Sequence, residues 1–138
     1  MVLLIEECKP QSSDCMKGIL TIILLILSNA FMTLAWYGHL YFKENKWLSK
    51  PGLMGVILLS WGLALFEYIF QVPANKIGFI GNNGPFNLFQ LKIIQEVISL
   101  TVFTFIAIFI FKSEKFTWNY MIGFVLMILA VFFIFKEK

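Results

Sequence analysis

Four long apolar runs constrain the fold of this 138-residue chain more than any other feature of its sequence. Each run is close to the roughly 20 residues that an α-helix needs to cross about 30 Å of hydrocarbon. Hydrophobic residues make up 59% of the chain and charged residues only 14%, well below the roughly 25% usual in soluble domains. Because the runs do not alternate with a period of two, they predict helices rather than barrel strands. We therefore predict an all-α integral membrane protein, a four-helix bundle with spans at about 19–37, 53–72, 91–111 and 118–135.

The connections between these runs are too short for a soluble domain, so residues 16–138 are predicted to form one four-helix domain. Residues 1–15 are predicted to be an N-terminal tail. Met16, followed by Lys17 and an apolar run, has the features of a second start, so translation from Met1 and translation from Met16 both stay open.

A cleavable signal peptide is a rival interpretation of the first run, because residues 28–30 have the small-x-small pattern of a cleavage site. The apolar run continues past that point and three more follow, which favours a membrane span. Both cysteines, Cys8 and Cys15, precede the first run, and they indicate neither a disulfide framework nor a metal site.

The lysines give no clear orientation in the membrane. All 11 basic residues are lysines, and four spans would place six on one side and five on the other, or five on each side from Met16. The positive-inside rule therefore gives no preference. Two interpretations stay open: cellular machinery resolves a weak signal, or the chain inserts both ways and pairs as an antiparallel homodimer. The two sets are Lys9, Lys17, Lys76, Lys92, Lys136 and Lys138 against Lys43, Lys46, Lys50, Lys112 and Lys115.

Polar residues in the second and third runs recur at helical spacing and are predicted to line one face of each helix. The carboxylates Glu67 and Glu96 each lie about five residues from the connection between the two runs, which places both about 7–8 Å inside the same membrane surface. Gln71, Lys92 and Gln95 share that depth. The two faces are Ser60, Ala64, Glu67, Gln71 and Asn75 in the second run, and Lys92, Gln95, Glu96 and Ser99 in the third.

A charged group inside the membrane costs roughly 2–3 kcal/mol on insertion scales, so these carboxylates need compensation. In one interpretation Lys92 pairs with Glu96 or with Glu67, and the polar groups hold the helices together. In the other, two acids share one lysine. The less compensated acid then exchanges a proton for a cation, as a solute site would require.

The first run carries Asn29, Thr33, Trp36 and Tyr37 on one face. A polar residue beside aromatic rings suits an amphipathic or cationic ligand, because aromatic faces attract cations. A helix–helix hydrogen bond beside an interfacial aromatic belt is the alternative. His39, just beyond, is interpreted as an interfacial residue.

Two other features concern packing. Trp61 departs from the aromatic belt and is expected to face the bundle. The fourth run carries Gly123, Met127 and Ala130 on one face. Small residues permit close helix approach, so this face is a candidate dimer contact, with lipid-facing packing as the alternative.

No phosphate-binding glycine loop, zinc spacing or nucleophile elbow occurs in the chain. We therefore expect no enzymatic activity, no cofactor, no metal and no nucleic-acid partner.

Several strings together resemble a small bacterial family of unknown function, domain-of-unknown-function family 486, which is placed in the drug/metabolite transporter superfamily. The resemblance covers about residues 16–135. The strings are Leu27-Ser28-Asn29 with Met32-Thr33, Ala35-Trp36-Tyr37-Gly38-His39, Glu67-Tyr68 with Gln71-Val72-Pro73-Ala74-Asn75, and Gln90-Leu91-Lys92 with Gln95-Glu96.

This resemblance implies a multi-pass protein of the bacterial inner membrane with a drug/metabolite transporter-like fold. The superfamily includes the small multidrug resistance proteins, four-helix chains that act as antiparallel dimers and exchange protons for cationic drugs. Those proteins carry their essential carboxylate in the middle of the first helix, whereas this chain has Asn29 in the matching region. Their drug-binding glutamate therefore has no counterpart here.

The sequence thus predicts a homodimeric transporter in the lipid bilayer that moves a small amphipathic or cationic solute, with Glu67 or Glu96 as the proton-linked group. Two alternatives stay open: a non-transporting membrane subunit that uses the polar groups as helix contacts, and a component of a lipid-linked-sugar flippase, for which Lys92 and Lys76 would be the contacts. The predicted site residues are Glu67, Glu96, Gln71, Asn75, Lys92, Gln95, Asn29 and Trp36.

Overall fold

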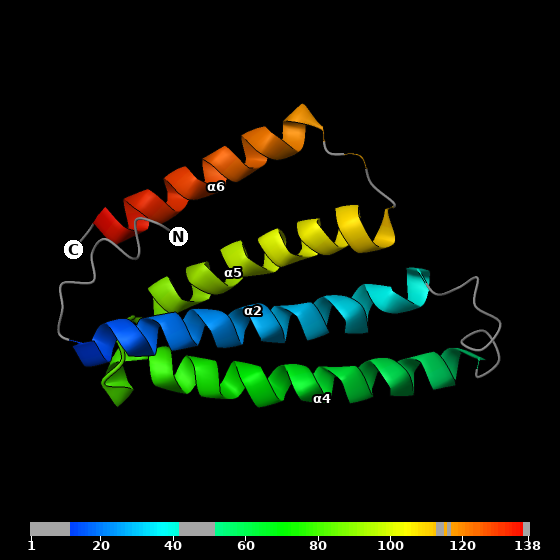
Figure 1. Cartoon of the computed structure of the whole chain (residues 1–138), viewed down its shortest axis with the longest axis horizontal. Coiled ribbons are helices and arrows are strands. Elements are labelled where there is room, and N and C mark those ends of the chain that lie inside the picture. Colours follow the sequence, from blue (N-terminus) through cyan, green and yellow to red (C-terminus); the bar gives the residue numbers. More distant parts are fainter. Residues whose placement is uncertain (1–11, 42–51, 113–114, 116, 137–138) are drawn as a thin grey trace.

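The computed structural model describes residues 12–41, 52–112, 115 and 117–136, and these form four long helical segments (Figure 1). Each segment is long and apolar enough to cross a membrane, which confirms the predicted all-α, four-span architecture. The segments are α2 (Ser12–Tyr41), α4 (Gly52–Gly78), α5 (Leu88–Phe105) continued by the π-helical turn η3 (Ile106–Phe111), and α6 (Trp118–Lys136).

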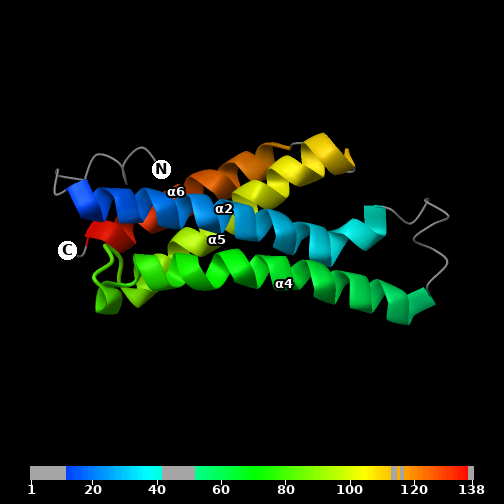
Figure 2. The ribbon, with the colours of Figure 1, turned by 60° about the horizontal axis from the view of Figure 1, so that its bottom comes forward.

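Helix α2 is the centre of the arrangement, because α4 packs on one side of it and α5 on the other (Figures 1 and 2). Helices α2 and α5 run in one direction and α4 and α6 in the other (Figure 1). Buried Leu25 of α2 belongs to one apolar cluster with Ala74 of α4 and with Leu91, Ile94 and Ile98 of α5. Helix α6 contacts α5 and has no buried residue, so it is the least enclosed of the four.

The four predicted spans lie inside the helices, which extend beyond them at most ends. Helix α2 begins at Ser12, so residues 12–15 of the predicted tail form its first turn, whereas residues 1–11 lie outside the described residues. The lysine-rich connection at 42–51 also lies outside them.

Pro73, just after the predicted span end at about residue 72, would end the helix or kink it near its end; it does not end it, because α4 continues to Gly78. A proline removes one backbone donor but does not prevent further turns when packing supports them. That packing comes from α2. Ala74 is fully buried, and a Cβ built on Gly78 would lie 2.8 Å from Cγ2 of Thr21. The close approach of the two helices therefore extends α4.

The connection from α4 to α5, residues 79–87, is compact and closes one end of the bundle; we call it the 79–87 loop. The Ile80 amide donates to the Phe86 carbonyl at 2.7 Å, and the Phe86 amide donates to the Gly78 carbonyl at 2.9 Å. Gly84 lies so close to the backbone of Gly78 that a Cβ would collide with it. Lys17 of α2 donates to the Asn83 carbonyl at 2.8 Å. These contacts hold the loop against the start of α2.

Helix α5 begins with a capping box that fixes its direction away from the loop. The Gln90 amide donates to Oδ1 of Asn87 at 2.8 Å, and the Asn87 amide donates to Oε1 of Gln90 at 3.1 Å. This reciprocal pair satisfies backbone donors that the first turn of a helix leaves free, and it accounts for the burial of the polar Gln90 side chain.

Candidate functional site

The antiparallel contact between α2 and α4 is close at one end and open at the other. Near the 79–87 loop, Thr21 lies against Gly78. Further along, Ser28 of α2 donates to Oε1 of Gln71 of α4 at 2.6 Å, and both side chains are buried. Beyond this hydrogen bond Phe31 of α2 stacks on Phe66 and Phe70 of α4, and a groove lies between the outer turns of the two helices.

Four buried polar side chains follow α2 along this contact. Thr21 and Thr33 each donate to the carbonyl four residues earlier, and so does the Nδ2 of Asn29, to Leu25 at 2.8 Å. The Oδ1 of Asn29 has no hydrogen-bond partner in the described part of the chain, although the side chain is 1% exposed. A buried acceptor without a donor costs about 1–3 kcal/mol, so Asn29 is the costliest polar group of the set Thr21, Ser28, Asn29 and Thr33.

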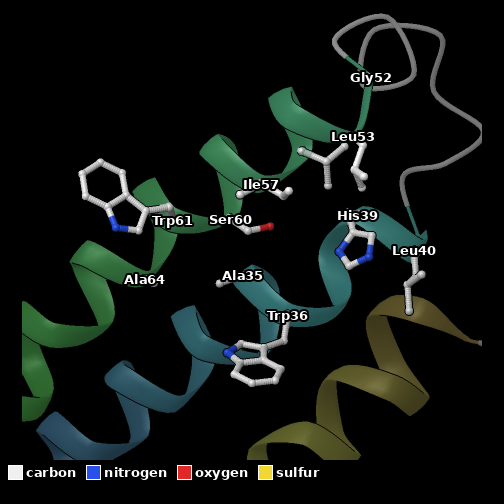
Figure 3. Close-up of a pocket in the computed structure, with 11 residues that line it drawn as sticks. Ala35, Trp36, His39, Leu40, Gly52, Leu53, Ile57, Ser60, Trp61 and Ala64 are labelled. Carbon is white, nitrogen blue, oxygen red and sulfur yellow. The ribbon is translucent and has the colours of Figure 1, made fainter.

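The groove has a volume of about 720 Å³ and extends from the ends of α2 and α4 toward the middle of the bundle (Figure 3). Ala35 and Ala64 lie at its inner end, and the indoles of Trp36 and Trp61 extend from opposite helices (Figure 3). It is lined by Ala35, Trp36, His39, Leu40, Gly52, Leu53, Val56, Ile57, Ser60, Trp61 and Ala64. We call this surface the aromatic groove.

Two hydrogen-bonding side chains face the aromatic groove from opposite helices, Ser60 from α4 and His39 from α2 (Figure 3). Neither makes a hydrogen bond with the described residues. The four helical threonines differ, because each donates to the carbonyl four residues before it. The Ser60 hydroxyl is thus available to a bound molecule.

Glu67 lies between the aromatic groove and the Ser28–Gln71 hydrogen bond. It shares a face of α4 with Ser60, Ala64 and Gln71, as the helical spacing predicts. The residue is half-buried, and its carboxylate makes no ion pair or hydrogen bond with the described residues. An uncompensated carboxylate at this depth is costly, which is typical of residues with a function in membrane proteins.

The second carboxylate, Glu96, has a different environment. It pairs with Lys92 at 2.6 Å one turn away on α5, and their side chains are 56% and 64% exposed. Among the described residues, no ion pair joins Glu67 to Lys92. The pairing of Lys92 with Glu96 agrees with the interpretation in which Lys92 compensates Glu96. Gln95 lies partly buried beside them.

The structure thus divides the predicted site residues between two helix contacts. Gln71, Asn29, Glu67 and Trp36 lie along α2 and α4, whereas Lys92, Gln95 and Glu96 lie on α5. Asn75 is partly buried near the end of α4, where its carbonyl accepts from the Phe79 amide at 3.1 Å.

Sequence reasoning did not include Ser28, Ser60, His39 and Trp61 in the site. Helical spacing already placed Ser60 on the face of Glu67, and this signal could have found it. Spacing within one helix does not show how α2 and α4 align. It therefore could not identify Ser28 as the partner of Gln71, or His39 and Trp61 as residues that line the groove. In the described residues, no group of three or more His, Cys, Asp or Glu side chains could hold a metal ion.

The chain matches the DMT_6 family model over residues 21–135. The family is described as "Putative member of DMT superfamily (DUF486)". No curated protein and no solved structure matches the chain. The matched region includes the whole of α4 and α5, most of α2 and α6, the Ser28–Gln71 hydrogen bond and the aromatic groove.

Proposed function

The chain belongs to the DMT_6 (DUF486) family, and from that premise we propose that it transports a small amphipathic solute across the membrane, with Glu67 as the proton-linked group. The main support for this proposal is the arrangement of residues on one face of α4. Along it, Ser60 and Ala64 line the aromatic groove, Glu67 follows one turn later with no partner among the described residues, and Gln71 follows with its hydrogen bond to Ser28. An open groove thus leads to an uncompensated acid.

A carboxylate beside such a groove can take up a proton when the site is empty and release it when a solute binds. This exchange requires that no lysine neutralises the acid permanently, and Glu67 meets the requirement among the described residues. Glu96 does not, because Lys92 compensates it. The proton-linked role therefore falls to Glu67 rather than to Glu96.

The two glutamates provide a matched experiment. We expect Glu67→Gln to abolish proton-driven uptake of an amphipathic solute into proteoliposomes, whereas Glu96→Gln keeps at least about half of the wild-type rate, because its exposed ion pair contributes little. The measurement is uptake of a radiolabelled panel of neutral and cationic aromatic amphiphiles under an imposed pH gradient. Wild-type rates in both variants, for a solute that the wild type transports, would refute the proposal.

The proposed transporter acts as a homodimer in a bacterial inner membrane. Four helices form a thin bundle, and α6 has no buried residue. A second copy packed against α6 would widen this bundle and leave the aromatic groove between α2 and α4 open to the bilayer.

A membrane subunit without transport is the second candidate, and the Ser28–Gln71 hydrogen bond favours it because polar contacts of this kind hold membrane helices together. If the polar residues are only helix contacts, Glu67→Gln leaves every solute-linked signal unchanged. Gln71→Leu then lowers thermal stability without any change in solute binding.

A further inference from the structure

We propose that the aromatic groove binds an uncharged, planar aromatic molecule that carries a hydroxyl or carbonyl group and reaches the groove from within the bilayer. The inference rests on the proposed function, since it names the class of solute for the same site. It narrows the amphipathic or cationic solute to a neutral one. Three features of the groove carry it: the arrangement of its aromatic side chains, its unpaired polar groups, and its charge.

Two exposed indoles border the groove and offer faces on which a flat ring can stack. Trp36 is 66% exposed and Trp61 is 70% exposed, and they come from opposite helices beside the small residues Ala35 and Ala64 (Figure 3). Small side chains between two large rings leave room for a planar body, and offset stacking on indole favours aromatic over aliphatic guests. In the described residues neither indole stacks on another ring, whereas several phenylalanines do.

The polar groups are placed to bind one small substituent. Ser60 and His39 lie at corresponding positions of the antiparallel helices, and both line the groove without a hydrogen-bond partner among the described residues. A hydroxyl and an imidazole can each donate or accept a hydrogen bond. The hydroxyl or carbonyl group of an aromatic compound could therefore form a hydrogen bond with Ser60 or His39, while its ring lies toward the indoles.

The charge of the groove separates a neutral solute from a cation. None of the lining residues is a carboxylate or a lysine. Indole faces attract cations, but a permanent cation in a groove bordered by lipid loses its hydration without gaining a counter-ion. Glu67 lies one turn beyond Ala64 and is outside the lining, so it is available for protons rather than for the solute.

The position of the groove indicates how the solute reaches it. The lining extends from Leu40 and Gly52, at the helix ends, to Ala64, about 18 Å along α4 at 1.5 Å per residue. The opposite end of the α2–α4 contact is closed by the 79–87 loop. A molecule dissolved in the outer part of the bilayer can therefore enter the groove sideways, between the two tryptophans.

The test uses three flat two-ring probes of similar size with the full chain in nanodiscs: 2-naphthol, naphthalene, which lacks the hydroxyl, and N-methylquinolinium, which carries a permanent charge. Displaceable binding of radiolabelled 2-naphthol is measured by scintillation proximity against empty nanodiscs. We expect saturable binding, with naphthalene weaker by about fivefold for the missing hydrogen bond and N-methylquinolinium weaker by about tenfold or more.

Matched variants connect this binding to the groove. Trp61→Ala should weaken 2-naphthol binding about tenfold and Trp61→Phe much less, whereas Trp118→Ala on exposed α6 should have no effect. Ser60→Ala should weaken it about fivefold. Trp61 is largely exposed, so its replacement does not threaten the fold. Binding that is absent in the wild type, unchanged in Trp61→Ala, or tighter for N-methylquinolinium than for 2-naphthol would overturn the inference.

These outcomes are separate from those of the proposed function. If 2-naphthol binds with the expected variant pattern but is never moved across the bilayer, transport is wrong and the site assignment stands. If another solute is transported through Glu67 while Trp61→Ala and Ser60→Ala have no effect on it, the site assignment is wrong and transport stands.

Discussion

At the scale of single residues, the Ser28–Gln71 hydrogen bond connects α2 to α4 where both side chains are buried. We expect Ser28→Ala to lower the free energy of unfolding by about 0.6–1.5 kcal/mol, because Gln71 loses its donor. The measurement is equilibrium unfolding in mixed micelles. Thr104→Ala is the control, since its hydroxyl bonds only within α5 and the residue is partly exposed. Equal effects of the two replacements would contradict a special role for the interhelical bond.

The sequence predicted which residues share a face but not which residues meet. The spacing of Ser60, Glu67 and Gln71 correctly placed them on one side of α4, because helical geometry fixes that relation. The same reasoning gave Glu67 and Glu96 a common depth, yet no ion pair joins the described residues of their helices. Depth in the membrane is one coordinate, whereas contact also depends on how each helix is rotated about its axis.

At the scale of elements, the 79–87 loop depends on a close backbone contact. A Cβ on Gly84 would collide with the backbone of Gly78, so Gly84→Ala should destabilise the protein by about 1–3 kcal/mol. It should also increase amide hydrogen exchange at Ile80 and Phe86, whose amides donate inside the loop. Thermal unfolding and exchange mass spectrometry measure the two effects.

Gly62→Ala is the matched control for this substitution, because a Cβ at Gly62 meets nothing within 4 Å. There the change should be neutral or stabilising by up to about 1 kcal/mol, since alanine favours helix over glycine. If both variants have the same stability, the close contact in the loop does not limit the fold.

The lengths of the apolar runs predicted the existence of all four helices, but local sequence signals did not give all of their ends. Pro73 removes a backbone donor and so disfavours further helix, yet α4 continues past it to Gly78. The turn after it is held by Ala74 and Gly78, which are buried against α2. That support belongs to the packed bundle and has no local signature in the sequence.

At the scale of the whole molecule, the balance of lysines permits insertion in both orientations, which an antiparallel form of the proposed homodimer would require. We expect C-terminal reporters that are active on opposite sides of the membrane to give signals of similar size, because neither end of the bundle carries a clear excess of positive charge. Added lysines in the 112–117 connection should shift the signal toward one reporter. Activity from one reporter alone in the unaltered chain would contradict dual insertion and, with it, an antiparallel dimer.

The α2–α4 contact is tightly packed at one end and has a groove at the other, so a small change in the angle between the helices has its largest effect at the groove. Thr21 and Gly78 are in close contact, and the level of His39 and Ser60 lies about 27 Å away along the helices. A tilt of only about 5° around this contact would change the width at that level by about 2 Å. A rotation that barely disturbs the packed end could therefore admit or expel a flat molecule, so a small change in the angle between two helices would be enough to set which molecules the groove accepts.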